Sequence, residues 1–126
     1  MEQSPEDIRG MPVNEAREYI LRFITSQKLN EKKLLLLNDE REKWKNRVSL
    51  ARNSAQDDLA ARAEAACQNI ENQLQSLEAE TTALKTQIRS MIRQIPGLAA
   101  RERSIDPDML EQELLLLAGL TPGGPA

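Results

Sequence analysis

The chain has 126 residues and is short of the side chains that build most active sites. It contains no histidine, and its one cysteine is Cys67. A zinc site needs about four nitrogen or sulfur ligands, so neither a metal nor another cofactor is expected. A disulfide framework is excluded as well, which fits a reducing cytoplasm. Cys67 itself is interpreted as a small helix residue rather than a reactive thiol.

Catalytic patterns and membrane segments are missing too. The sequence has no Ser-His-Asp set and no Gly-rich phosphate loop, and no carboxylate pair stands beside an apolar pocket that would separate the two pKa values. We therefore do not expect an enzyme. No apolar run approaches the roughly 20 residues of a membrane span. The first residues, MEQSPEDIRG, are acidic and polar, so they do not form a signal peptide.

What the chain does contain is typical of long helices. Charged residues make up 29% and aromatic residues only 2% of the sequence, a composition found in coiled coils. From Asn14 to about Arg52, one stripe advances by alternating steps of four and three, the rhythm of a heptad repeat. Its members are Ala16, Ile20, Phe23, Gln27, Asn30, Leu34, Leu37, Arg41, Trp44, Val48 and Ala51.

A second helix is predicted from about Ala55 to Ile95, stopping at Pro96-Gly97. A tight turn near 53–54 precedes it, because Asn53 tolerates a left-handed backbone and Ser54 begins a capping box. The stripe of the second helix consists of Leu59, Ala63, Ala66, Ile70, Leu74, Leu77, Thr81, Leu84, Ile88, Met91 and Ile95.

The two stripes match when the chain folds back at this turn. Trp44 then faces the small Ala63, and Gln27 faces Thr81 in a polar layer with Asn30. Residues 14–53 carry ten basic and six acidic side chains, whereas residues 54–95 carry four and six, so the two arms have opposite net charge. The sequence therefore predicts an all-α fold, a long antiparallel coiled-coil helical hairpin over residues 14–95.

The remaining segments are short. Residues 1–13 are expected to be a loose leader with at most one helical turn, and residues 96–106 a loop. Asp106 as N-cap, Pro107 at the first helical position and Gly119 after the last predict a short amphipathic helix over 107–118. Residues 119–126 are expected to form a disordered tail.

The predicted turn region carries a resemblance to a known family. The stretch WKNRVSLARNSAQDDLAARAEAA, from Trp44 to Ala66, resembles the hairpin tip of the phage shock protein A and vesicle-inducing protein in plastids family. In that family a tryptophan precedes a K/R-A-x-x-A-L segment, and a polar turn and a D-L-A-x-A-A segment follow. The matching positions here are Trp44, Arg47, Val48, Leu50, Ala51, Asp58, Leu59, Ala60, Arg62 and Ala63.

The resemblance implies a hairpin that assembles with other proteins, as a scaffold within the envelope stress response. Two features of the family are not found in this sequence. Its members begin with a basic amphipathic helix that inserts into membranes, unlike residues 1–13 here. They also continue past the hairpin with several helices that build polymers, whereas one short acidic helix follows here.

Two runs of four leucines, 34–37 and 114–117, raise the question of what the extra leucines contact. Leu34 and Leu37 belong to the stripe, so Leu35 and Leu36 must emerge on another face, together with Leu29 and Ile24. Such leucines are either scattered surface residues or a second interface. Our hypothesis is that the C-terminal helix, whose stripe is Leu110, Leu114 and Leu117, folds back or docks across subunits onto this second face.

These observations favour a non-enzymatic scaffold that associates with itself and with an unidentified protein partner. The candidate interface residues are Leu29, Leu35, Leu36, Trp44, Leu110, Leu114 and Leu117, with Trp44 interpreted first as a residue of the helix seam. The alternatives are a lipid-bound coat peripheral to the inner membrane and an export or secretion chaperone. Nucleic acid is not an expected partner, because Glu40 and Glu42 interrupt the basic group around Arg41 and the net charge is −3.

Overall fold

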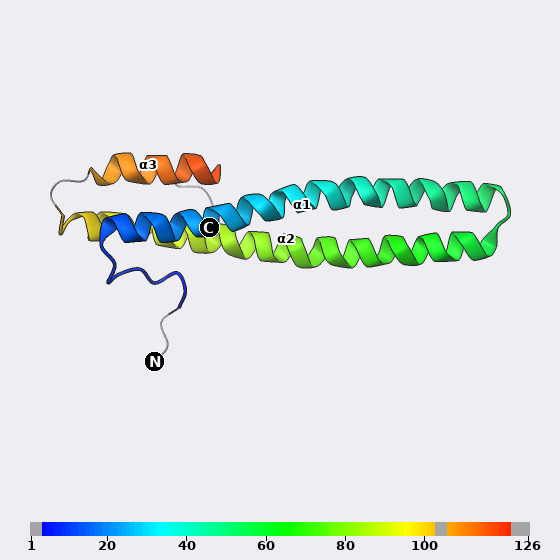
Figure 1. Cartoon of the computed structure of the whole chain (residues 1–126), viewed down its shortest axis with the longest axis horizontal. Helices are drawn as coiled ribbons and strands as arrows, with labels where there is room; N and C mark the ends of the chain where they lie inside the picture. The colour runs from blue at the N-terminus through cyan, green and yellow to red at the C-terminus, as the bar shows by residue number, and fades with distance from the viewer. Residues whose placement is uncertain (1–3, 103–105, 122–126) are drawn as a thin grey trace. The chain divides into compact units, whose positions relative to one another are not determined.

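The computed structural model describes residues 4–102 and 106–121. Of these, 83% are helical and none lies in a β-strand. The helices are α1 (Val13–Asn53), α2 (Asp57–Ala99) and α3 (Pro107–Ala118), and the two long ones pack together (Figure 1). The chain divides into two compact units. Unit 1 comprises the residues up to Leu29 and from Thr82 onward, and unit 2 is Asn30–Thr81.

The turn between α1 and α2 lies slightly later than the sequence indicates. Asn53 is still helical, and Ala55 has the left-handed backbone instead, with φ 56°. The Gln56 N–H donates to the Ala51 carbonyl (2.8 Å), and the Ala55 N–H donates to that of Arg52 (3.1 Å). These are the two bonds of a Schellman motif, which satisfy carbonyls at the end of α1. Helix α2 therefore begins at Asp57 rather than Ala55.

The prediction that the second helix stops at Ile95 is wrong, because α2 continues through Pro96 to Ala99. A proline removes one helical hydrogen bond and crowds the preceding turn. Here the following turn is held by packing, since Leu98 and Ala99 are only 4% exposed. Turn hydrogen bonds lead on from Ala100 to Glu102. The predicted 96–106 loop is thus shorter, and residues 103–105 lie outside the described residues.

Helix α3 has the bounds and both caps that the sequence indicates. The Asp106 carboxylate accepts hydrogen bonds from the N–H groups of Asp108 (3.0 Å) and Met109 (3.5 Å). Gly119 closes the helix with φ 71°, and the Leu120 N–H donates to the Leu115 carbonyl at 2.8 Å. Leu120 is 9% exposed and belongs to the core of unit 1. The predicted tail therefore cannot begin at 119, and residues 122–126 lie outside the described residues.

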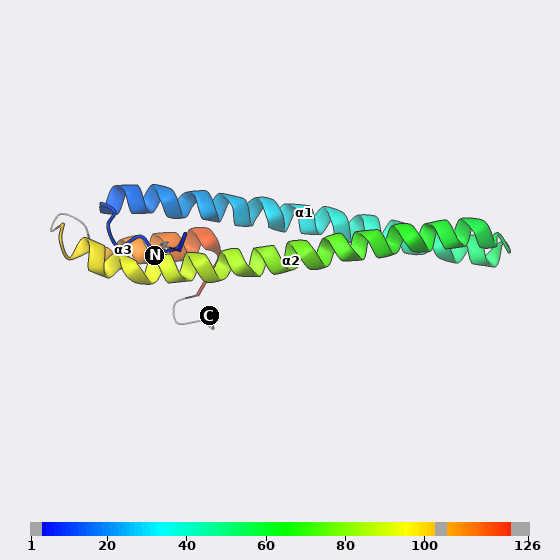
Figure 2. The ribbon, with the colours of Figure 1, turned by 90° about the horizontal axis from the view of Figure 1, so that it is seen from below.

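Unit 1 is a three-helix arrangement with a well-buried core. Residues of α1 before Asn30 and of α2 after Thr81 pack beside α3 (Figures 1 and 2). At the surface of this core, the Tyr19 and Phe23 rings are tilted with centroids 5.1 Å apart. The buried core residues are Ile8, Val13, Ala16, Ile20, Ile24, Ile88, Met91, Ile92, Ile95, Leu98, Ala99, Leu114, Ala118 and Leu120.

The segment before α1 is held against unit 1, so the prediction of a loose leader is wrong for residues 4–12. Ile8 is 1% exposed, and its N–H donates to the Gln94 side chain at 3.0 Å. The Gln94 amide in turn donates to the Glu6 carbonyl at 2.6 Å. Hydrogen bonds from the Arg9 guanidinium lower the pKa of Asp7 to about 2. The segment is thus held by one buried isoleucine and one glutamine side chain. It has no periodic pattern of apolar residues from which the sequence could predict this.

Unit 2 is a two-helix unit whose interface is less completely covered. On α1 the predicted stripe is half-buried, as at Leu34, Leu37 and Trp44, whereas Ile70 and Leu74 of α2 are buried. Leu59 departs from the prediction, because it is 51% exposed and Ala60 is buried in its place at 5%. Near the turn, therefore, small alanines face α1 and a leucine is left at the surface.

The polar residues expected in one layer are all buried. Gln27 (0% exposed) is in unit 1, where its amide donates to the Ala118 carbonyl at 3.1 Å. Asn30 (7%) and Thr81 (4%) belong to unit 2. The Thr81 hydroxyl donates to the Leu77 carbonyl of its own helix at 2.7 Å.

Candidate protein-interaction site

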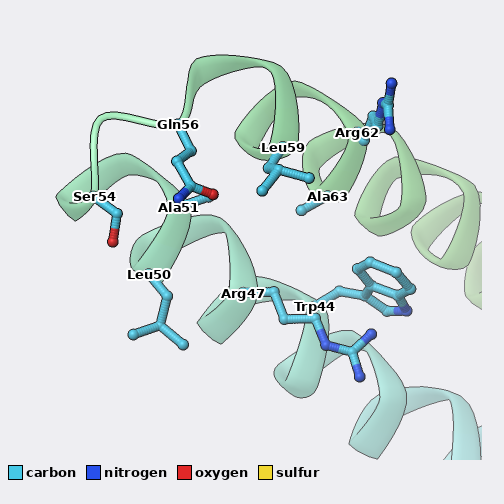
Figure 3. Close-up of a pocket in the computed structure, with 9 residues that line it drawn as sticks. All are labelled: Trp44, Arg47, Leu50, Ala51, Ser54, Gln56, Leu59, Arg62 and Ala63. Atoms are coloured by element: carbon cyan, nitrogen blue, oxygen red, sulfur yellow. The ribbon is translucent and has the colours of Figure 1, made fainter.

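An open groove lies at the end of unit 2 where α1 turns into α2, and we call it the tip groove. It has a volume of about 470 Å³. Figure 3 shows residues of both helices and of the turn around it. The lining residues are Trp44, Arg47, Leu50, Ala51, Ser54, Gln56, Leu59, Arg62 and Ala63.

Local sequence explains why this groove exists. Helix α2 presents Ala60 and Ala63, which are 5% and 4% exposed, to α1. Alanines fill little space, so the bulky Trp44 ring on α1 lies between the helices and stays half-buried (Figure 3). Trp44 and Ala63, which the sequence pairs, line the same groove. Trp44 is therefore both a residue between the helices and part of an accessible surface.

The groove combines apolar surface with positive charge. Leu50 of α1 is 66% exposed and Leu59 of α2 is 51% exposed, so each helix contributes one exposed leucine to the lining. The Arg47 guanidinium carbon lies 4.4 Å from the centroid of the Trp44 ring, a cation–π contact. Arg62 lines the α2 side.

No acidic residue is among the described residues that line the groove. Asp57 and Asp58 begin α2 outside it. Arg52, which directly follows the lining residue Ala51, is not itself part of the lining and is paired with Glu64. Two arginines beside exposed leucines thus form a cationic apolar site.

The leucines of the first run divide between the helix interface and the surface. Leu34 and Leu37 are half-buried, while Leu35 and Leu36 are 68% and 64% exposed. Leu29, which belongs to unit 1, is 55% exposed. These three leucines are thus placed on the surface, as the sequence indicates, but Ile24, expected beside them, is buried in the core of unit 1.

The C-terminal helix folds back within the chain, which was one form of the hypothesis, but the face that it covers does not include Leu29, Leu35 or Leu36, which stay exposed. Helix α3 folds back within the chain onto unit 1, where Leu114 is 0% and Ala118 1% exposed. The Arg17 guanidinium donates to Glu113 at 2.7 Å, which raises the pKa of Arg17. The Lys28 ammonium also lies 3.5 Å from the Ala118 carbonyl. These contacts fix α3 to the first turns of α1.

The predicted stripe of α3 is only partly the buried one. Leu110 is half-buried against the core and Leu114 is fully buried, but Leu117 is 45% exposed. Ala118 takes the inward position instead, and Leu115 packs beside it. Leu117 and Ala118 lie three and four residues after Leu114, and either spacing places a residue on the same helix face. The sequence pattern alone therefore does not determine which of the two is buried.

Sequence reasoning identified Trp44 but missed most of the tip groove. The sequence places Leu59 on the helix seam and matches Leu50 and Arg62 only to positions of the family resemblance, so none of the three is predicted as an interface residue. The available signal was the pairing of Trp44 with alanine, because a large residue opposite small ones leaves space beside it.

Comparisons with protein-family models, curated proteins and solved structures found no match. Among the described residues, no helix combines the length and apolarity needed to cross a membrane. Nor do the described residues contain a group of three or more histidine, cysteine or acidic side chains suited to a metal ion. The site is accordingly interpreted from its own geometry.

Proposed function

We propose that this protein is a non-enzymatic scaffold built on an antiparallel coiled-coil hairpin, which associates with itself and binds a protein partner at the tip groove. The observation that carries the proposal is the groove itself. It places exposed leucines, a tryptophan and two arginines in one concave surface of about 470 Å³. Tryptophan and arginine are the residues most enriched at energetically important protein contacts.

The coiled-coil hairpin is supported by the burial of heptad positions on both helices of unit 2. The heptad positions of unit 2 on α1 are all buried or half-buried, from Asn30 to Ala51. On α2, Ala63, Ile70 and Leu74 are buried in heptad positions. Regular burial at steps of three and four is what packing of knobs into holes requires.

The partner that the groove fits is an amphipathic helix with acidic residues beside its apolar stripe. Its leucine-like side chains would cover Leu50, Leu59 and the Trp44 ring. Its carboxylates would approach Arg47 and Arg62 without opposition from an acid in the groove. This is recognition of a helix in a hydrophobic groove.

Trp44 provides a direct measurement, because it is the only tryptophan of the chain. We would titrate the protein with two designed helical peptides that share a leucine face and carry either glutamates or lysines elsewhere. The glutamate peptide is expected to shift the Trp44 emission to shorter wavelength and to saturate. The lysine peptide is expected to leave the emission unchanged, because it meets two arginines.

The variant Leu50→Gln with Leu59→Gln removes apolar surface from the groove and is expected to weaken binding of the glutamate peptide by about tenfold or more. Leu116→Gln is the control, since it removes an exposed leucine of α3 that does not line the groove. Equal binding of both peptides, or an unchanged affinity of the groove variant, would contradict the proposal. A shift caused by anionic vesicles but not by the glutamate peptide would favour the membrane coat instead.

A further inference from the structure

One face of α1 in unit 2 carries a charge pattern that is complementary to itself. Leu35 and Leu36 lie at its centre and are 68% and 64% exposed. At 3.6 residues per turn, Lys32 lies one turn before this pair and Asp39 one turn after it, on the same face. Both of these charged residues are exposed. Along the helix, this face is therefore positively charged first, apolar at its centre and negatively charged at its end.

This face points away from α2. The residues that lie on the other side of α1 are Asn30, Leu34, Leu37 and Arg41, and they are buried or half-buried. Half a helical turn separates this set from Lys32 and Asp39. A second helix can consequently approach the exposed face without meeting α2 of the same unit.

We propose that two copies of this chain pair through this face in an antiparallel, two-fold arrangement; the inference rests on the self-association included in the proposed function. Antiparallel pairing about the midpoint of Leu35 and Leu36 brings Lys32 of each copy to Asp39 of the other. The leucines of both copies meet at the centre. Every contact is thus made twice, as in any isologous dimer.

The charges select this arrangement over its alternatives. Parallel pairing in register would place Lys32 against Lys32 and Asp39 against Asp39, so both contacts would be repulsive. Antiparallel pairing makes both contacts attractive and still buries the four leucines. Lys28 and Lys43 come one further turn from the centre, where crossing helices diverge, so their repulsion is small.

The contact extends over roughly two turns of each helix, which is small for a protein interface. The dimer is therefore weak, and sedimentation equilibrium at high protein concentration is the suitable measurement. Wild-type protein is expected to show a concentration-dependent increase in mass toward a dimer. Added salt is expected to weaken the association, because exposed ion pairs are screened.

Charge reversal gives a specific test of the pairing. Lys32→Asp alone and Asp39→Lys alone each turn two attractive contacts into repulsive ones. Each is expected to raise the dissociation constant by about tenfold or more. A mixture of these two variants restores both contacts between unlike chains, so it is expected to form a heterodimer. The chain that carries both substitutions is expected to dimerise like wild type.

Lys33→Asp is the matched control. It makes the same change of charge on the adjacent residue, which lies about a quarter turn or more away from the centre of the face. It is expected to leave the dimer unchanged, and circular dichroism verifies that every variant keeps its helices.

The outcomes separate this inference from the proposed function. If wild-type protein is monomeric at all concentrations, both the self-association and this geometry are wrong. If it associates but the mixed variants do not recover the dimer, only the geometry is overturned. Peptide binding at the tip groove is measured independently through Trp44 in the same variants.

Discussion

At the scale of single residues, the two leucine runs show how helix geometry assigns different roles to identical neighbours. In α3, Leu114 is 0% exposed, while Leu116, two residues later, is 79% exposed. In α1, Leu34 and Leu37 lie toward α2, while the leucines between them face solvent. The sequence predicts this division in α1 because a long heptad stripe defines the inner face. In α3 twelve residues define the face less sharply, so Leu117 was placed inward although Ala118 holds that position.

The contrast between Leu114 and Leu116 provides a prediction about stability. Leu114→Ala removes a side chain from the packed core of unit 1 and is expected to lower the free energy of unfolding by about 2–5 kcal/mol. Leu116→Ala makes the same chemical change on the surface of the same helix and is expected to alter it by less than about 0.5 kcal/mol. Urea denaturation followed by circular dichroism measures both. Equal effects of the two substitutions would show that α3 is not docked on unit 1 in solution.

At the scale of elements, helix ends were predictable where a local side chain determines them. Asp106 and Gly119 cap α3 at the expected positions, because capping needs only neighbouring backbone groups. The helix ends near the turn and at Pro96 were not predictable in this way, because no capping side chain stands at the position where either helix ends. Ala55 adopts a left-handed backbone although an asparagine stands two residues earlier. Helix α2 passes through Pro96 because Leu98 and Ala99 are buried beyond it.

The helical turn around Pro96 suggests a stabilising substitution. Pro96→Ala restores a backbone hydrogen-bond donor within α2, which stabilises the folded state. Alanine also makes the unfolded chain more flexible, which opposes this gain. The net effect is expected to be a free energy of unfolding that is higher by about 1–2 kcal/mol. Gly97→Ala serves as a comparison, because a Cβ there would meet nothing within 4 Å. Gly97→Ala is expected to raise the free energy of unfolding by about 0.5–1 kcal/mol. Thermal unfolding measures both effects. A lower melting temperature of the Pro96 variant would mean that α2 ends before this residue.

At the scale of the whole molecule, the sequence predicts a hairpin of two long helices but not the division into two units. Heptad spacing is similar along both halves, so it does not reveal that only one half is covered by further segments. The segment around Ile8 was interpreted as loose because a single apolar residue has no periodicity. Its burial depends on Gln94, which is 86 positions later in the chain. Contacts of this kind are not encoded in a local pattern.

The division into units predicts different local stability. The interface of unit 1 contains many residues below 6% exposure, whereas the α1 stripe of unit 2 is half-buried at every position from Leu34 to Ala51. Hydrogen exchange of backbone amides is expected to be slower at Ile20 and Met91 than at Leu37 and Val48. In the Leu114→Ala protein this difference is expected to become smaller, because α3 no longer protects unit 1 fully. Uniform exchange along both helices of the wild type would contradict this prediction.

The hydrogen bonds that fasten unit 1 together also bear on how the chain acquires its structure during translation. They link residues 86 to 96 positions apart, as between Ile8 and Gln94 or Arg17 and Glu113. The first turns of α1 leave the ribosome long before these bonding partners are synthesised. Unit 2, whose helices are joined by a three-residue turn, can close in the meantime. A nascent chain consequently carries Ile20 and Ile24 without their native cover until α3 emerges.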